Sequence, residues 1–344
     1  MTYVTLGRTG IKACKNGFGA LPIQRVDLKE SVYILQKAFY NGVNFFDTAR
    51  GYTDSEEKLG YAFEHVRERL FISTKTPSTT VKGFWDDLDT SLKMLRTDYI
   101  DIYQFHNPDF CPLPGDGSGL YEAMAEAKKQ GKIRFIGITN HRADTARKAV
   151  ESGLYDSLQF PFSYLATDLD ISLVNACKER NVGFLAMKGM SGGLITNSAA
   201  AYAYMSQYDN VLPIWGVQHD HELDEWLSYN NAPPALDDAM RAVIEHDRGE
   251  LLGDFCRGCG YCLPCPVGIP INMAARVIYM IRRLPYKRFI TRSFQADMEK
   301  IEDCLHCNAC ASRCPYKLDT PALLRSNLEQ YREFVAAHSD EVED

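Results

Sequence analysis

The sequence predicts an α/β protein in which a (β/α)₈ TIM barrel, residues 1–250, is followed by a smaller cysteine-rich domain, residues 251–344. Two observations support this division. Strand-like and helical patterns alternate through roughly the first 217 residues, and eight of the 11 cysteines fall between Cys256 and Cys314. A chain of 344 residues is long enough for a main domain of about 250 residues and a second, smaller one.

The predicted strands are eight short apolar runs, several of which end in polar residues. They are residues 17–23, 43–47, 70–75, 100–106, 135–140, 157–162, 182–188 and 211–217. Segments with helical apolar spacing lie between them, at 31–40, 55–66, 84–95, 121–129, 143–152 and 169–180. A helical pattern at 235–247 is expected to close the barrel, and 321–337 is expected to form a terminal helix.

A doubly wound nucleotide-binding sheet is the alternative architecture, and its glycine fingerprint should follow the first strand. Here Gly17-Phe18-Gly19 is followed by Ala20-Leu21-Pro22, so the third glycine is missing and a proline stands in its place. The sequence therefore favours the barrel.

Composition and charge favour a small-molecule ligand. The net charge is −7 and the pI is near 5.7, whereas nucleic-acid binding needs a basic surface for the phosphates. No apolar run approaches the roughly 18 residues that cross a bilayer, and the opening MTYVTLGRTG lacks the regions of a signal peptide. We expect a cytoplasmic protein that binds neither nucleic acid nor a membrane.

Four chemically active side chains fall at or just after the ends of successive predicted strands. Asp47 ends the second strand, Lys75 the third and His106 the fourth, and Tyr52 follows Asp47 by five residues. In a barrel these strand ends surround one opening, where catalytic residues gather. We therefore expect all four side chains at the barrel mouth.

Together the four residues predict a site that donates a proton. A tyrosine with a pKa of about 10 is a poor acid at neutral pH, and we expect the Lys75 ammonium to lower the pKa of Tyr52. Asp47 would hold Lys75 charged and oriented, and His106 would hydrogen-bond the substrate oxygen. This chemistry indicates interconversion of a carbonyl and an alcohol, with the hydride carried by a cofactor.

Residues 1–235 resemble the aldo-keto reductases. The opening LGRTGIKACKNGFGALPI is similar to the family's amino-terminal hairpin and first strand, and NFFDTARGYTDSEEKLG is similar to its signature around the catalytic Asp47 and Tyr52. STK matches the family motif for Lys75, and YQFHNPD matches that for His106. The resemblance implies a nicotinamide cofactor that lies extended across the barrel mouth without a Rossmann fold.

The resemblance also implies residues that contact the nicotinamide. Asn140 of GITNH and Gln159 of SLQFPF would hold its carboxamide. Met187 stands where many members stack an aromatic ring on the nicotinamide.

The last strand departs from the family pattern, which usually offers Lys, Ser or Arg to the phosphates of NADP. This chain has IWGVQHDHELDEW, in which the backbone of Gly216, Val217 and Gln218 would contact a pyrophosphate. Glu222 falls near the usual arginine position and would repel a 2′-phosphate. Between NAD(H) and NADP(H), we therefore favour NADH.

The cysteine-rich domain contains two runs of four cysteines, each followed by proline. The second run, Cys304-x2-Cys307-x2-Cys310-x3-Cys314-Pro315, matches the bacterial ferredoxin pattern in full. The first run, Cys256-x2-Cys259-x2-Cys262-x2-Cys265-Pro266, is one residue shorter before its fourth cysteine. Zinc is the alternative, but zinc ribbons use cysteine pairs and not runs of four that end in Cys-Pro. We therefore predict two [4Fe–4S] clusters.

The eight cysteines divide between the two clusters by a simple rule. In two-cluster ferredoxins each cluster takes three cysteines from one run and the fourth from the other. One site is thus expected at Cys256, Cys259, Cys262 and Cys314, and the other at Cys304, Cys307, Cys310 and Cys265. This arrangement resembles that of a branch of the aldo-keto reductases that carries a C-terminal ferredoxin-like domain.

Three functions are open from the sequence. The first is a reductase of a small carbonyl or alcohol substrate whose clusters exchange electrons with a partner protein such as ferredoxin. The second is the same enzyme with purely structural clusters. The third is a redox sensor or electron carrier with a non-catalytic barrel, which the complete set of four catalytic residues disfavours. A flavin would split a hydride's electron pair for the clusters, but the sequence shows no flavin motif.

Overall fold

The structure, a computed structural model, describes residues 1–251 and 255–342. The chain forms two compact units, Met1–Gly189 with Ser198–Arg241, and Met190–Asn197 with Ala242–Asp344. The division falls inside helix α9 (Asp238–Leu251), earlier than the boundary expected after residue 250. Residues 252–254, near the start of the expected cysteine-rich domain, and 343–344 lie outside the described residues.

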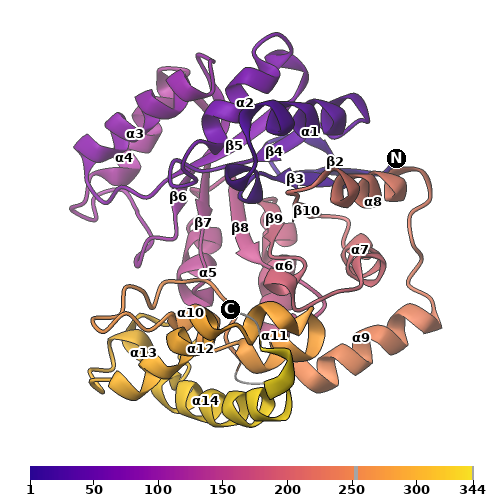
Figure 1. The fold of residues 1–344 in the computed structure, drawn as a ribbon. Coiled ribbons are helices and arrows are strands. Elements are labelled where there is room, and N and C mark those ends of the chain that lie inside the picture. Colours follow the sequence, from indigo (N-terminus) through magenta and orange to yellow (C-terminus); the bar gives the residue numbers. More distant parts are fainter. Residues whose placement is uncertain (252–254, 343–344) are drawn as a thin grey trace. The chain divides into compact units, whose positions relative to one another are not determined.

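Eight parallel strands close into a barrel in the first unit (Figure 1). They are β3 (Gly17–Gly19), β4 (Phe45–Asp47), β5 (Phe71–Thr76), β6 (Ile100–His106), β7 (Ile133–Thr139), β8 (Ser157–Pro161), β9 (Gly183–Met187) and β10 (Val211–Gly216). Each strand pairs with the next along the chain, and β10 closes the barrel on β3, with Ile214 opposite Gly17. The predicted (β/α)₈ barrel is confirmed, and the doubly wound sheet is wrong.

Helices follow the barrel strands and lie outside them (Figure 1). The six predicted from periodicity are α1 (Leu28–Tyr40), α2 (Ser55–Phe63), α3 (Val81–Met94), α4 (Leu120–Lys129), α5 (Ala143–Ser152) and α6 (Asp168–Glu179). Side chains cap some of their first turns: Asp27 accepts a hydrogen bond from the Glu30 N–H at 3.0 Å. Helix α5 ends at Gly153, whose φ of 74° favours glycine.

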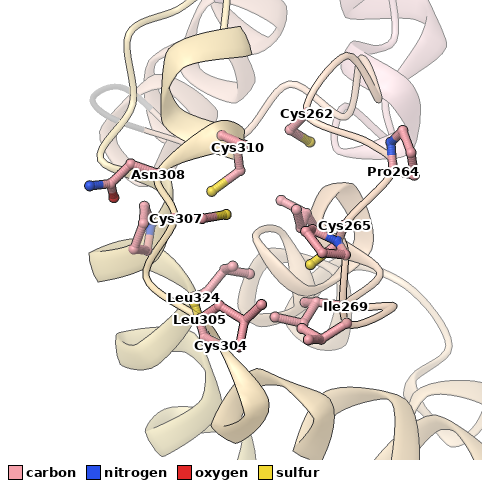
Figure 2. Close-up of a pocket in the computed structure, with 15 residues that line it drawn as sticks. Cys262, Pro264, Cys265, Ile269, Cys304, Leu305, Cys307, Asn308, Cys310 and Leu324 are labelled. Carbon is pink, nitrogen blue, oxygen red and sulfur yellow. The ribbon is translucent and has the colours of Figure 1, made fainter.

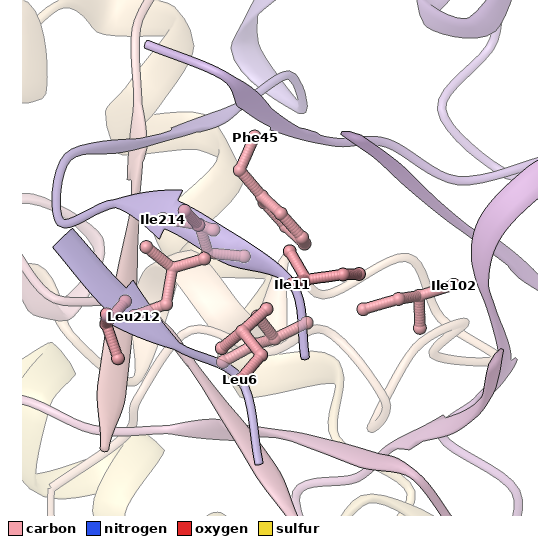
Figure 3. Packing of buried hydrophobic residues seen from close by; sticks show 9 residues of the cluster. Leu6, Ile11, Phe45, Ile102, Leu212 and Ile214 are labelled. Atoms are coloured by element: carbon pink, nitrogen blue, oxygen red, sulfur yellow. The ribbon is translucent and has the colours of Figure 1, made fainter. Parts of the chain in front are cut away.

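An amino-terminal hairpin, β1 (Tyr3–Thr5) and β2 (Lys12–Cys14), contributes side chains to the core (Figure 3). Val4, Leu6, Ile11 and Ala13 are buried in one apolar cluster with side chains of the barrel strands. Those barrel residues are Phe45, Ile102, Leu185, Leu212 and Ile214. Phe45 precedes Asp47 by two positions on β4 and so faces the same side of the strand, which puts the apolar cluster beneath the predicted site.

The helix that follows the last barrel strand is α8 (Asp220–Asn231), and not the segment expected at 235–247. The helix predicted at 235–247 is present as α9, but its predicted role in closing the barrel is wrong, because apolar residues within the polar stretch before it already form a buried helical face. Leu223, Trp226 and Leu227 recur at helical spacing and are buried, and α8 contacts α1. Residues 238–247 belong instead to α9, most of which lies in the second unit.

Helix α7 (Ser198–Ser206) precedes the last barrel strand and is not predicted by apolar periodicity. Seven of its nine residues are buried, so the helix has no polar face to set against an apolar one.

The second unit consists of helices and the cysteine-bearing segments between them. After α9 the helices are α10 (Ile271–Ala274), α11 (Val277–Arg283), α12 (Arg292–Glu299), α13 (Ala309–Arg313) and α14 (Thr320–Ala337). The terminal helix α14 is held by two buried hydrogen bonds: Tyr331 Oη donates to the Phe289 carbonyl at 2.6 Å, and Asn327 Nδ2 to the Ala274 carbonyl at 3.0 Å. Within the described ranges, no helix combines the length and hydrophobicity that a bilayer crossing requires.

Candidate functional site

The four residues predicted for catalysis lie together at the C-terminal ends of neighbouring barrel strands. Asp47 ends β4, Lys75 is near the end of β5, His106 ends β6, and Tyr52 lies between β4 and α2. Lys75 Nζ is 2.7 Å from Asp47 Oδ2 and 5.1 Å from the centre of the Tyr52 ring. The rings of Tyr52 and His106 have their centres 5.8 Å apart and are nearly perpendicular, at 82°.

Asp47 and Lys75 form an ion pair inside the barrel, where they are 3% and 1% exposed. Lys75 also donates a hydrogen bond to the Thr48 carbonyl at 2.5 Å. Burial raises the pKa of Asp47 and lowers that of Lys75, while each charge opposes the shift of the other. Because the two groups are in direct contact and both have further hydrogen-bond partners, we assign both as charged.

Tyr52 and His106 are uncharged at neutral pH. Burial raises the pKa of Tyr52, and the Asp47 carboxylate raises it further. The predicted net lowering of the Tyr52 pKa is therefore wrong, because burial and the Asp47 carboxylate outweigh the stabilisation of a phenolate by the Lys75 ammonium. Burial lowers the pKa of His106 to about 3, and the positive charge of Lys75 acts in the same direction. The site thus presents a phenol and a neutral imidazole.

A buried hydrogen-bond network beneath Asp47 includes side chains that the sequence analysis missed. Gln159 Nε2 donates to Asp47 Oδ2 at 3.3 Å, and Gln104 Nε2 is 2.7 Å from both Gln159 Oε1 and Ser73 Oγ. Strand alternation is the signal that could have found them. Gln104 lies two positions before His106 on β6, and Ser73 two positions before Lys75 on β5, so each shares a face with a predicted catalytic residue.

The segment that carries Tyr52 is tied to the neighbouring strand β5. The Arg50 N–H donates to the Lys75 carbonyl at 2.9 Å. The Arg50 guanidinium pairs with Glu56, which is 1% exposed and accepts a hydrogen bond from Thr74 Oγ1 at 2.6 Å. These contacts restrict the position of the Tyr52 ring relative to Lys75.

The three residues expected to contact a nicotinamide come from consecutive strands β7, β8 and β9. Asn140 directly follows β7, and its backbone N–H donates to the Gln159 carbonyl at 3.0 Å. Asn140 Nδ2 donates to the Pro108 carbonyl at 2.8 Å, which leaves its second N–H for a ligand, and Gln159 Nε2 likewise has two N–H groups. Met187 ends β9 and is half-buried. The two amides and the apolar Met187 fit a ring that bears a carboxamide.

At the last strand the structure brings a carboxylate to the expected phosphate site. Gly216 ends β10 and is exposed, whereas Val217 is 2% exposed. The N–H groups of Gln218 and His219 donate to Glu222 Oε2 at 2.7 and 3.0 Å. The backbone N–H of Gln218 is therefore engaged, and the first turn of α8, which would otherwise attract a phosphate, already has a negative charge.

In the second unit, two cavities are lined by the cysteines of the two runs. One is lined by Cys265, Cys304, Cys307 and Cys310 together with Cys262. Figure 2 shows the sulfurs of Cys307 and Cys310 on one side of this cavity and that of Cys265 facing them. The remaining lining is uncharged and mostly apolar, with Ile269 and Leu324 among its members.

The other cavity is lined by Cys256, Cys259, Cys262 and Cys314. Each cavity thus has one of the two expected ligand sets around it, and among the eight cysteines Cys262 is the one that lines both. Across the described residues, no three Cys, His, Asp or Glu side chains converge closely enough to ligate a single ion. Thiols spread around a cavity fit a multi-atom cluster better than one tetrahedral zinc ion.

Two segments of the chain match known families. Residues 15–203 match the Aldo/keto reductase family, and residues 255–319 match the 4Fe-4S dicluster domain. The first match covers more than half of the chain, and the second covers both cysteine runs up to Cys314.

Three curated relatives illustrate the similarity of the first segment. The chain is 30% identical over 219 residues to aldo-keto reductase YhdN of Bacillus subtilis, which covers 57% of this chain and 64% of that protein. It is 32% identical over 211 residues to L-galactose dehydrogenase of Arabidopsis thaliana, covering 56% of this chain and 66% of that protein. It is 27% identical over 222 residues to NADH-specific methylglyoxal reductase of Escherichia coli, covering 57% of this chain and 68% of that protein. The chain therefore spans just under two thirds of the length of the first two.

Among solved structures, an aldo-keto reductase from Bacillus halodurans in its holo form superimposes with a TM-score of 0.64. The match covers 72% of this chain and 96% of that one at 20% sequence identity. A putative aldo-keto reductase of Pseudomonas aeruginosa gives a TM-score of 0.58 at 23% sequence identity, and the match covers 66% of this chain and 93% of that one. Both similarities concern the fold.

Proposed function

This chain belongs to the aldo/keto reductase family and carries a 4Fe-4S dicluster domain, and we propose that it interconverts a small carbonyl substrate and its alcohol with NADH as the cofactor. The observation that carries the proposal is the convergence of Tyr52, His106 and the Asp47–Lys75 ion pair at the barrel mouth. These groups can donate a proton to an oxygen atom and stabilise the charge that develops there.

Tyr52 is the general acid in this proposal. A bound nicotinamide supplies the hydride to the carbonyl carbon, or accepts it in the reverse direction. The phenol of Tyr52 is kept protonated by its raised pKa, so its proton is available when negative charge develops on the substrate oxygen. In alcohol oxidation the proton returns to Tyr52.

Lys75 and His106 stabilise the charges of this proton transfer. The Lys75 ammonium, 5.1 Å from the centre of the Tyr52 ring, lowers the energy of the phenolate that remains after the proton has left. The neutral imidazole of His106 donates one N–H to the substrate oxygen and needs no protonation to do so. Asp47 holds Lys75 in place without taking part in the transfer.

The choice of NADH rests on Glu222. Its carboxylate accepts from the N–H groups of Gln218 and His219, where it would repel a 2′-phosphate. Similarity to a relative whose name specifies NADH supports the same choice.

The clusters, in this proposal, exchange single electrons with a partner protein. A hydride carries two electrons, whereas each cluster takes one at a time, so a one-electron carrier is the simpler partner. Cys307 is exposed and Leu305, two residues before it, is 63% exposed, which would bring one cluster within reach of such a carrier. Cys262 and Ile271 line both cavities, so the two clusters would be neighbours.

Tyr52→Phe tests the catalytic proposal. We expect the variant to bind NADH as the wild type does and to lose about 10²–10⁴-fold in kcat for a reactive aldehyde such as methylglyoxal. Tyr61→Phe, which removes the hydroxyl of an exposed tyrosine on α2, is the matched control and should retain full activity. Unchanged turnover in Tyr52→Phe would exclude Tyr52 as the acid.

Anaerobic reduction tests the role of the clusters. The visible absorption of the holoprotein should bleach with a reduced ferredoxin and remain unchanged with stepwise NADH. Bleaching by NADH alone would overturn the separation of hydride and single-electron chemistry. If neither reductant bleaches the clusters, electron exchange is excluded and the clusters serve the fold.

A further inference from the structure

Arg276 is a buried cation next to the loop that carries the first cysteine run. It is the residue before α11 and is 9% exposed. Its guanidinium packs against Gly258, which lies between Cys256 and Cys259, so closely that a Cβ at that position would overlap Nη1. On its other side Nη2 donates to the Gly192 carbonyl at 2.7 Å. The guanidinium is thus held between two glycines.

Among the residues that the structure describes, Arg276 has no acidic side chain as a partner. Across residues 1–251 and 255–342, no carboxylate pairs with it, and its buried Nε has no hydrogen-bond partner. Arg283, at the other end of α11 and with a side chain that is 9% exposed, differs in this respect because Asp247 pairs with it at 2.9 Å. An uncompensated buried charge is costly, so Arg276 requires a counter-charge that the side chains do not provide.

The sulfur of Cys256 is the group on which Arg276 acts. The Gly258 N–H donates to Cys256 Sγ at 3.4 Å, so the glycine that contacts the guanidinium also contacts this sulfur. A hydrogen-bond donor at Gly258 and the buried guanidinium packed against the same glycine both favour negative charge at this sulfur.

We propose that Arg276 is the counter-cation of the cluster held by Cys256, Cys259, Cys262 and Cys314, and that it raises the reduction potential of this cluster alone. Four thiolates give a [4Fe–4S] site a net negative charge, which increases on reduction, so a fixed buried cation favours the reduced form. The inference rests on the cysteine assignment proposed above and does not depend on the nicotinamide chemistry.

The cavity of the other cluster differs in charge. The described residues that line it around Cys265, Cys304, Cys307 and Cys310 include no charged side chain. Arg257 lines the cavity of the Cys256 run, and Arg276 contacts Gly258 of the same loop. We therefore expect Arg276 to give the cluster of the Cys256 run the higher reduction potential, so that this cluster accepts the first electron.

Arg276→Gln tests the inference in the holoprotein, because it keeps an N–H donor for the Gly192 carbonyl and removes the charge. Both clusters are titrated anaerobically and followed by electron paramagnetic resonance, which separates their signals. At a fixed potential, the ratio of reduced to oxidised form of the cluster of the Cys256 run should fall about tenfold, which is equivalent to a lowering of its reduction potential by about 59 mV for a one-electron couple. The reduction potential of the other cluster should be unchanged.

Two further variants control for shape and charge. Arg276→Lys keeps the charge and should shift the ratio of reduced to oxidised cluster by less than about threefold. Arg283→Gln removes an arginine that is paired with Asp247 and should leave the reduction potentials of both clusters unchanged.

Two results would overturn the inference. One is that wild type and Arg276→Gln titrate at the same potentials, and the other is that Arg276→Gln and Arg276→Lys shift the ratio equally. If Arg276→Gln does not fold, Arg276→Met replaces it. Failure of the wild type to bind two clusters would instead overturn the cysteine assignment.

Discussion

The carboxylate of Asp47 and the ammonium of Lys75 are 2.7 Å apart in the barrel interior, with 4% and 1% of their side chains exposed. Side chains from two further strands approach this pair, because Gln159 on β8 and Gln104 on β6 both donate to Asp47. The Lys75 ammonium places a positive charge near the Tyr52 ring, and the buried Asp47 carboxylate neutralises that charge. A proton can therefore leave Tyr52 beside a fixed cation while the resting site remains neutral overall.

Removing one partner of this ion pair should destabilise the protein. Lys75→Met leaves the Asp47 carboxylate buried and unpaired, and we expect a loss of about 3–5 kcal/mol in the free energy of unfolding at pH 7, measured with urea. The double variant Asp47→Leu/Lys75→Met should recover most of this loss, because no buried charge remains. Lys82→Met, at an exposed lysine, is the control. A loss below about 1 kcal/mol in Lys75→Met would contradict a charged pair.

The pKa of His106 predicts how stability depends on pH. Its folded-state pKa of about 3 lies below the ordinary value of 6.5, so between these values the unfolded chain binds the proton that the folded chain does not. The contribution of His106 to stability is complete above pH 6.5 and is lost as the pH falls towards 3. His106→Gln should therefore flatten the stability profile between pH 4 and pH 6.5, as measured by thermal unfolding in matched buffers. An unchanged slope would contradict a neutral, buried imidazole.

The carboxylate of Glu222 should decide between the two nicotinamide cofactors. Glu222→Gln keeps an oxygen that can accept from the Gln218 and His219 N–H groups but removes the charge, so we expect the Kd for NADPH to fall about tenfold with little change for NADH. Fluorescence titration of the anaerobic protein measures both. Glu225→Gln, the same change one turn further along α8, should alter neither constant. An equal gain for both cofactors would show that the 2′-phosphate does not meet Glu222.

Replacing Cys265 tests how the cysteines divide between the clusters, because Cys265 ends the run that is one residue shorter before its fourth cysteine. Cys265→Ala should lower the iron content from about eight to about four per chain and remove the spectroscopic signal of only one cluster. Cys111→Ala, at a buried cysteine of the barrel unit, should keep the full iron content. Loss of both clusters in Cys265→Ala would argue for a single cooperative cluster site, and loss of neither would remove Cys265 from the ligand set.

Much of the barrel could be predicted from the sequence because its signals are local. A buried strand such as Ile100–His106 is a short apolar run, and a helix such as Ala143–Ser152 repeats its apolar residues every three or four positions. The same reasoning misses α7, which is buried on most sides, and assigns the closing helix to 235–247 and not to α8. Burial of Leu223, Trp226 and Leu227 depends on the surface against which α8 packs, which local composition does not reveal.

The sequence by itself determined the alternation of strands and helices, the four candidate catalytic residues at successive strand ends, and the two runs of cysteines. Only the tertiary structure decided the charge states and the partners. Closure of the barrel buries Asp47 against Lys75 and raises the pKa of Tyr52. It also brings Gln104 and Gln159, from separate strands, into one hydrogen-bond network. Folding of the second unit gathers the cysteines around two cavities and holds Arg276 between Gly258 and Gly192. The physical reason is that periodicity and spacing act along the chain, whereas desolvation and pairing depend on which distant side chains the fold brings into contact.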